Sequence, residues 1–100
     1  MVAEKPKKSK QFNKLNMVRI SASFNIQGAL KVRHRRNGID INTQVLHQSG
    51  TVDFTNENDG DVIRIGGYSQ GGAIINYYRN EQLIESRTYP FGPILDAFYI

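Results

Sequence analysis

Two histidines are the side chains in this sequence best suited to acid–base or metal chemistry, because the chain has no cysteine. Neither His34 nor His47 stands in a metal-ligand or hydrolase spacing such as H-E-x-x-H. A hydrolase would also need a positioned nucleophile and an acid that orients the histidine. We therefore expect no enzyme, no catalytic residue, no metal site and no cofactor. We interpret His34 as a half-buried histidine beside Arg36.

Two further segments resemble ligand-binding loops in composition but lack residues that such loops require. Residues 56–61 (NENDGD) have the composition of a calcium loop, but the positions that supply its first and last acidic ligands are not acidic. An ordinary solvated turn is the better interpretation, since Asn, Asp and Gly are turn residues. The Gly66–Gly72 segment lacks the Lys-Ser/Thr of a phosphate loop. We expect it to be a loop or bulged crossing that presents Tyr68 to solvent.

The basic residues are the stronger functional signal, because they gather at one end of the chain. Residues 1–36 contain ten Lys/Arg and one acid, whereas residues 37–100 contain three Arg and eight acids. The net charge of +4 hides this split. A positive region can bind an anionic polymer, or the negative remainder of another copy of the chain. The predicted basic binding residues are Lys5, Lys7, Lys8, Lys10, Lys14, Lys31, Arg33 and Arg35.

The first part of the chain is expected to be a flexible basic arm. Residues 1–14 hold five Lys, one Pro and few apolar groups, so they cannot bury enough surface to order themselves. From Met17 the pattern changes, because Val18, Ile20, Ala22, Phe24 and Ile26 alternate with polar residues. Such alternation predicts a strand with one buried face. A chain of 100 residues is one domain, which we place at residues 15–100.

Asn37-Gly38 marks a hairpin, since this dipeptide readily adopts the positive φ angles of a type I′ turn. A two-residue turn pairs Arg36 with Ile39 and Arg35 with Asp40, and a regular register then runs back to Leu30 opposite Val45. One predicted face holds Leu30, Val32, Ile39, Ile41 and Val45, with His34 and Arg36 near its tip. The other face holds Lys31, Arg33 and Arg35, with an acid directly across from Arg35 alone. No aromatic ring shares this cationic face in the predicted pairing.

Further strands are predicted at 51–55, 62–65, 73–78 and 83–89, the last two forming a hairpin around Arg79–Gln82. Residues 94–100 (ILDAFYI) are a last strand, a short docked helix or an interface segment. No stretch shows a helical period. The fold class is therefore all-β: a small antiparallel sandwich or barrel of about six or seven strands.

Two classes of function fit these features. The first is a non-enzymatic assembly protein, for example a small oligomeric subunit of a phage or virus particle, whose basic arm and hairpin contact an acidic partner or packaged nucleic acid. The alternative is a stand-alone, sequence-nonspecific nucleic-acid-binding β-barrel. Tyr68, Phe98, Tyr99 and Ile100 are candidate interface residues. We expect self-association or another subunit, with DNA or RNA as a further partner and no membrane. The expected location is soluble, cytoplasmic or particle-associated, because the sequence shows no signal peptide or spanning segment.

Overall fold

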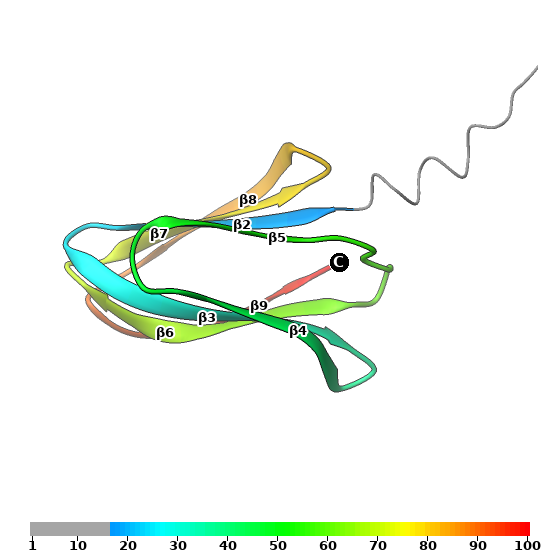
Figure 1. Cartoon of the computed structure of the whole chain (residues 1–100). Coiled ribbons are helices and arrows are strands. Elements are labelled where there is room, and N and C mark those ends of the chain that lie inside the picture. Colours follow the sequence, from blue (N-terminus) through cyan, green and yellow to red (C-terminus); the bar gives the residue numbers. More distant parts are fainter. Residues whose placement is uncertain (1–16) are drawn as a thin grey trace, which may run out of the picture.

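A computed structural model describes residues 17–100, which form eight antiparallel strands in two four-stranded sheets (Figure 1). The predicted all-β class is confirmed, and the architecture is two facing sheets with more strands than the six or seven expected. The basic arm predicted for residues 1–14 lies outside the described residues. The strands are β2 (Val18–Phe24), β3 (Gln27–Arg36), β4 (Ile39–Leu46), β5 (Gly50–Phe54), β6 (Val62–Gln70), β7 (Ala73–Arg79), β8 (Gln82–Tyr89) and β9 (Gly92–Tyr99).

The two ends of the molecule differ in their connections. One sheet has the order β5-β2-β7-β8 and the other β4-β3-β6-β9. The connections β2–β3, β4–β5, β6–β7 and β8–β9 all change sheets, and they lie together at the left end in Figure 1. At the opposite end the β3–β4 and β7–β8 hairpins project, and the β5–β6 connection crosses between the sheets. We call this second end the open end.

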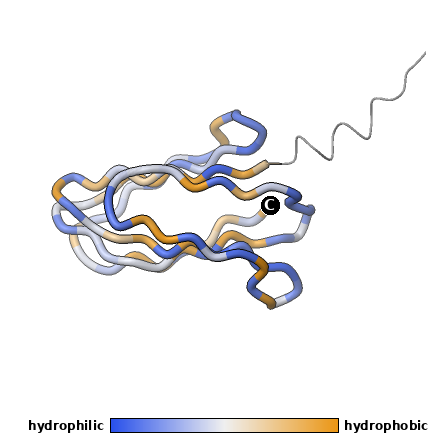
Figure 2. Tube along the Cα trace, viewed as in Figure 1, coloured by the Kyte–Doolittle hydropathy of each residue, from blue (hydrophilic) through white to orange (hydrophobic). Residues whose placement is uncertain are grey.

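Alternation along the strands builds the core between the sheets. In β2, Val18, Ile20 and Ala22 are buried as predicted. Ile26 was predicted to continue this face but is 71% exposed, because β2 ends at Phe24 and the chain turns toward the other sheet. Figure 2 shows the hydrophobic segments of both layers, and also hydrophobic residues in the two projecting hairpins. The core comprises Val18, Ile20, Ala22, Leu30, Val32, Val52, Phe54, Ile63, Ile65, Ala73, Ile75, Tyr77, Ile94 and Phe98.

The β3–β4 hairpin has the predicted turn but not the predicted register. Arg36 pairs with Ile39 and Arg35 with Asp40, as expected, and then a bulge between His34 and Arg35 shifts the pairing by one residue. The bulge leaves Ile41 without a partner in the ladder. A one-residue shift exchanges the two faces of a strand.

The predicted inward positions of β4 are wrong, at Val45 because of this shift and at Ile39 although it pairs with Arg36 as predicted. Ile39, Ile41 and Val45 are 68%, 48% and 46% exposed, and Leu46 packs against the core. The edge position of β4 permits this outcome, because the hairpin projects at the open end and its tip has no facing sheet to cover it (Figure 1).

The glycine-rich segment predicted as a loop is mostly strand. Residues 66–70 belong to β6, and only Gly71 and Gly72 form the turn to β7. Gly67 is required by a close approach: a Cβ there would lie 2.0 Å from the carbonyl oxygen of Ala29. The C-terminal residues form a strand rather than a helix, since β9 pairs along β6 from Val62–Tyr99 to Ser69–Gly92.

Candidate functional site

The outer face of the β4-β3-β6-β9 sheet collects cations from two neighbouring strands. Lys31, Arg33 and Arg35 project from β3 on the face opposite the buried Leu30, Val32 and His34. Arg64 of β6 pairs directly with Arg33 in the ladder, so it adds a fourth cation to the same surface. We call this surface, defined by Lys31, Arg33, Arg35 and Arg64, the basic face. The sequence predicted the three β3 cations and missed Arg64, because the partner of β3 was unknown.

Two of these cations have no ion-pair partner among residues 17–100. Arg35 Nε lies 2.9 Å from Asp40 Oδ1, and Arg33 Nη1 lies 3.7 Å from Asp40 Oδ2. One carboxylate therefore serves two arginines, although Asp40 stands directly across the ladder from Arg35 alone, as predicted. Lys31 and Arg64 make no ion pair with any other described residue, and both are exposed. Positive charge on this face exceeds negative charge.

The β3–β4 hairpin itself carries no aromatic ring on the basic face, as predicted, but β6 and β9 add rings to it. The ladder places Arg35, Val62 and Tyr99 in one cross-strand row, and Tyr99 is 76% exposed. A hollow of about 590 Å³ lies beside this ring, with Arg35 and Arg64 among its lining residues. Farther along β6, Tyr68 is 45% exposed and makes an edge contact with Phe91, their ring centroids 5.7 Å apart. Exposed rings therefore lie on the same sheet surface as the cations, Tyr99 in the row of Arg35 and Tyr68 beyond Lys31.

The outer face of the other sheet is close to neutral. Arg19 of β2 is its cation, and Arg19 Nε donates to Asp53 Oδ1 across the β2–β5 ladder at 2.7 Å. That hydrogen bond raises the pKa of Arg19 further. Ser21, Ser23 and Asn76 occupy much of the remaining surface. The charge asymmetry seen along the sequence thus becomes an asymmetry between two sheet faces.

Most acids of residues 37–100 are paired with cationic side chains of the same molecule, several of them at its surface. Asp40, Asp53, Asp59, Glu85 and Asp96 pair with arginines, and Glu57 and Asp61 contact His34. The edge strands β8 and β9 of the two sheets are joined by side-chain contacts, and we call this side of the molecule the β8–β9 edge. There, Arg87 Nη1 lies 2.9 Å from Asp96 Oδ2, and the guanidinium carbon of Arg87 lies 4.1 Å from the ring centre of Phe98. The negative half of the sequence therefore acts mainly in internal pairs.

The candidate interface residues are divided by the structure. The prediction is wrong for Phe98, which is 1% exposed and belongs to the core, so its side chain cannot contact a partner. Ile100 is partly buried against the core, and its backbone N–H donates to Asp61 O at 3.0 Å. Tyr68 and Tyr99 are exposed on the basic face. The predicted binding lysines Lys5, Lys7, Lys8, Lys10 and Lys14 lie outside the described residues.

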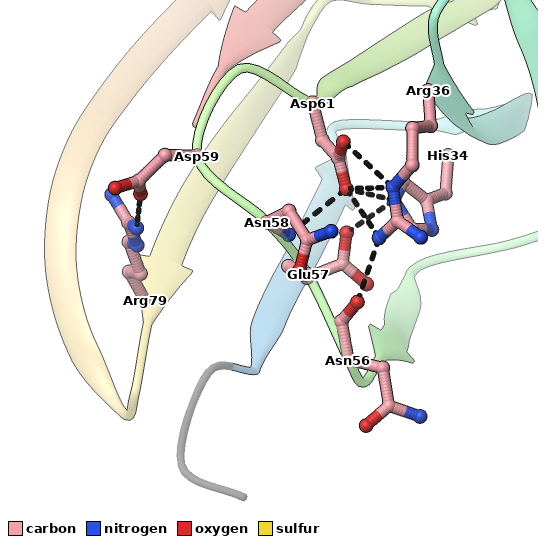
Figure 3. A network of polar contacts seen from close by, with 8 residues as sticks. All are labelled: His34, Arg36, Asn56, Glu57, Asn58, Asp59, Asp61 and Arg79. Carbon is pink, nitrogen blue, oxygen red and sulfur yellow. Dashed lines mark hydrogen bonds and ion pairs between the residues drawn. The ribbon is translucent and has the colours of Figure 1, made fainter. Parts of the chain in front are cut away.

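A polar cluster of the buried His34, Glu57 and Asp61 and the partly exposed Arg36 closes the core at the open end (Figure 3). His34 Nε2 lies 2.7 Å from Asp61 Oδ2 and 2.7 Å from Glu57 Oε1. Arg36 Nη2 donates to Asp61 Oδ2 at 2.9 Å and Arg36 Nε donates to Asp61 Oδ1 at 3.0 Å. The cluster ties the β5–β6 connection to β3.

The pKa values of the two carboxyl groups of this cluster are shifted in opposite directions. Burial raises the pKa of Glu57 to about 7, and the charge of Asp61 adds to the rise against the opposing effects of His34 and Arg36. Burial also favours protonation of Asp61. Hydrogen bonds from Arg36, the Asn58 N–H and His34 outweigh that effect, so the pKa of Asp61 lies well below its usual range.

The sequence interpretation of residues 56–61 as a solvated turn is therefore wrong for two of its three acids, while Asp59 is exposed as predicted. Glu57 and Asp61 are 1% and 2% exposed, and His34 is buried rather than half-buried. A signal for this cluster was present in the alternation of β3, which directs His34 and Arg36 to the core side. Buried cationic groups require anionic partners.

Comparisons with known proteins identify no relative: no family model matches the chain, and no curated protein or solved structure is significantly similar to it. Within residues 17–100 there is no helix long and apolar enough to cross a membrane.

Proposed function

We propose that the basic face binds single-stranded nucleic acid, with its cations on the phosphate backbone and Tyr99 stacked on a base. The observation that carries this proposal is the position of Tyr99, which is 76% exposed in the same cross-strand row as Arg35. Proteins that bind single strands without sequence preference combine a positive surface with aromatic stacking platforms. The hollow lined by Arg35, Arg64 and Tyr99 has both components.

The charge distribution supports this proposal over head-to-tail association of opposite charges. An acidic surface would be needed for such association, and seven acids of the described residues already pair with His or Arg in the same molecule. Lys31 and Arg64 have no such partner among residues 17–100. These two cations can therefore contact phosphates without first breaking an internal ion pair.

The salt dependence of binding tests this proposal directly. The full chain is titrated with a fluorescently labelled oligothymidine and with a duplex of equal length, and anisotropy is followed over a range of salt concentrations. Each phosphate contact with a single strand contributes roughly 0.7 to the slope of log affinity against log salt. Lys31→Ala and Arg64→Ala should each lower the slope by about that amount.

Arg19→Ala is the matched control, because it removes one positive charge from the outer face of the other sheet. We expect it to leave the slope nearly unchanged. Absence of binding at low salt would reject the proposal. An equal decrease of the salt slope in Arg19→Ala and Arg64→Ala would show that net charge, and not the basic face, determines binding.

Assembly is a second candidate function, supported by apolar residues on the projecting hairpins. Ile39 and Ile41 near one tip are 68% and 48% exposed, and Leu83 and Ile84 near the other are 52% and 53% exposed. We propose that these hairpins contact a partner subunit through apolar surface. Association of this kind should persist at high salt, as measured by light scattering. A monomer at every protein and salt concentration tested would rule out self-assembly.

A further inference from the structure

Three potential metal ligands converge in the buried cluster at the open end. His34 Nε2, Glu57 Oε1 and Asp61 Oδ2 come from β3 and the β5–β6 connection, and the three ligand atoms lie within 4.8 Å of one another. All three side chains are buried. His34 is also held in place from one side, because its ring meets Phe54 edge-on with centroids 6.0 Å apart.

Glu57 is the member of this cluster without a hydrogen-bond partner. The proton on His34 Nε2 can be directed at one acceptor, and the hydrogen bond runs to Asp61 Oδ2 at 2.7 Å. Glu57 Oε1 lies equally close to that nitrogen but lacks hydrogen-bond geometry, and neither Glu57 oxygen has a donor within the described residues. A buried carboxylate without a donor is costly. A cation bound among the three groups would remove that cost.

We propose that His34, Glu57 and Asp61 bind a divalent transition-metal ion of the Zn²⁺ type, independently of the function of the basic face. One imidazole nitrogen and two carboxylates suit Zn²⁺, whereas Ca²⁺ and Mg²⁺ prefer all-oxygen sites. The metal would replace the proton between His34 and Asp61 and would accept Glu57 as its third protein ligand. A fourth position would be left for water or for the second oxygen of Glu57.

The required rearrangement concerns the spacing of the three ligand atoms and the donors already on Asp61 Oδ2. Bonds of about 2.0–2.1 Å in a tetrahedron place ligand atoms about 3.3 Å apart. The two contacts of 2.7 Å to His34 Nε2 would therefore need to widen by roughly 0.6 Å. Glu57 and Asp61 stand in a connection between strands, where side-chain rotation can supply that change.

Arg36 would act outside the metal shell. Its Nε donates to Asp61 Oδ1 at 3.0 Å, on the oxygen that the proposed metal does not use. Such outer contacts orient a ligating carboxylate. Its Nη2 and the Asn58 N–H donate to Asp61 Oδ2 at 2.9 and 3.0 Å, so metal binding at Oδ2 would have to displace these two donors. The positive charge of Arg36 will lower the affinity for a divalent cation compared with a similar site that lacks it. Bound metal would attach the β5–β6 connection to β3 more firmly than the hydrogen bond alone.

Zinc binding by the full chain tests this proposal, using Zn²⁺ added to the folded protein and, separately, during refolding. Competition with a coloured chelator should show one Zn²⁺ per chain, with no equivalent binding of Ca²⁺ or Mg²⁺. Glu57→Gln keeps the shape of the side chain, and it should weaken zinc binding by about tenfold or more. His47→Gln is the control, because it alters the exposed histidine outside the cluster and should have no effect.

Two results would overturn the proposal. One is the absence of stoichiometric zinc in both native and refolded protein. The other is an equal loss of binding in Glu57→Gln and His47→Gln. If Glu57→Gln does not fold, the visible spectrum of Co²⁺ bound to the His47→Gln protein decides: tetrahedral bands support the buried site, and their absence rejects it.

Discussion

Tyr99 is the residue on which the proposed interaction with bases depends most. Its ring is exposed beside Arg35 and Arg64, and it stands near the end of β9. Stacking of a base on an aromatic side chain contributes roughly 1–3 kcal/mol. Tyr99→Ala should therefore weaken single-strand binding by about 5-fold to 150-fold, while duplex binding changes little.

Tyr78→Ala is the matched control for Tyr99, because Tyr78 lies on the outer face of the other sheet, paired with Arg19. Anisotropy titrations at one fixed salt concentration compare the two variants. Equal single-strand affinities of Tyr99→Ala and the unmodified chain would show that stacking on this ring does not occur. The cations of the basic face could then still act through phosphates alone.

At the scale of one strand, Gly67 fixes how closely β6 approaches β3. Its Cβ would meet the Ala29 carbonyl oxygen at 2.0 Å, and backbone atoms cannot move aside cheaply. Gly67→Ala should destabilise the fold by about 1–3 kcal/mol or more, lowering the melting temperature by roughly 4–8 °C per kcal/mol. In Gly66→Ala the added Cβ would lie 4.0 Å from the Ile94 carbonyl oxygen, so this variant should have a melting temperature close to that of the unmodified chain. Calorimetry that ranks the two variants equally would contradict this account of β6.

The stability of the β8–β9 edge should depend on pH through Asp96. Burial favours protonation of this carboxyl. Hydrogen bonds from the Ala97 N–H, the Tyr89 hydroxyl and Arg87 outweigh burial and lower the pKa of Asp96. Between the lowered pKa and the ordinary value of 3.8, the unfolded chain binds more protons than the folded one. The stability contributed by Asp96 is therefore present above pH 3.8 and is lost as the pH falls through the folded-state pKa.

Asp96→Asn separates this effect from the other acids, since Asp61 also has a lowered pKa and is present in both proteins. Urea unfolding at neutral pH should show the variant to be less stable than the unmodified chain. Below pH 3.8 the difference should shrink. A difference that is independent of pH would mean that Asp96 acts by packing and not by charge.

The elements themselves were largely predictable from the sequence, and their pairing partners were not. Alternation in β2 and the Asn37-Gly38 turn located their strands, because these signals are local. The bulge that leaves Ile41 unpaired was missed, because the alternation of residues along β4 does not mark it. Arg64 and Tyr99 joined the basic face through the β3–β6 and β6–β9 ladders, which link residues far apart in the chain. Sequence patterns reveal the face of a strand more readily than its neighbour.

Across the whole molecule, the split of charge along the sequence becomes a difference in which charged side chains can contact a partner. Acids are placed where they hold the ends and edges: Asp61 at the open end, Asp96 at the β8–β9 edge, and Asp59 with Arg79 beside the second hairpin. Cations are also consumed in these contacts, but Lys31 and Arg64 remain without partners among residues 17–100. The net charge of +4 thus understates how strongly one surface is biased.

The many connections that change sheets also have a consequence for how fast the chain can fold. Consecutive strands mostly lie in different sheets, so within the described residues only β3–β4 and β7–β8 are pairings of chain neighbours. β2 is fully paired only when Val18 lies opposite both Phe54 of β5 and Arg79 of β7. Ordering long segments before contacts form slows folding, and all-β domains of this kind typically need milliseconds to seconds. Stopped-flow refolding should fall in that range, with the two hairpins as the earliest structure to resist hydrogen exchange.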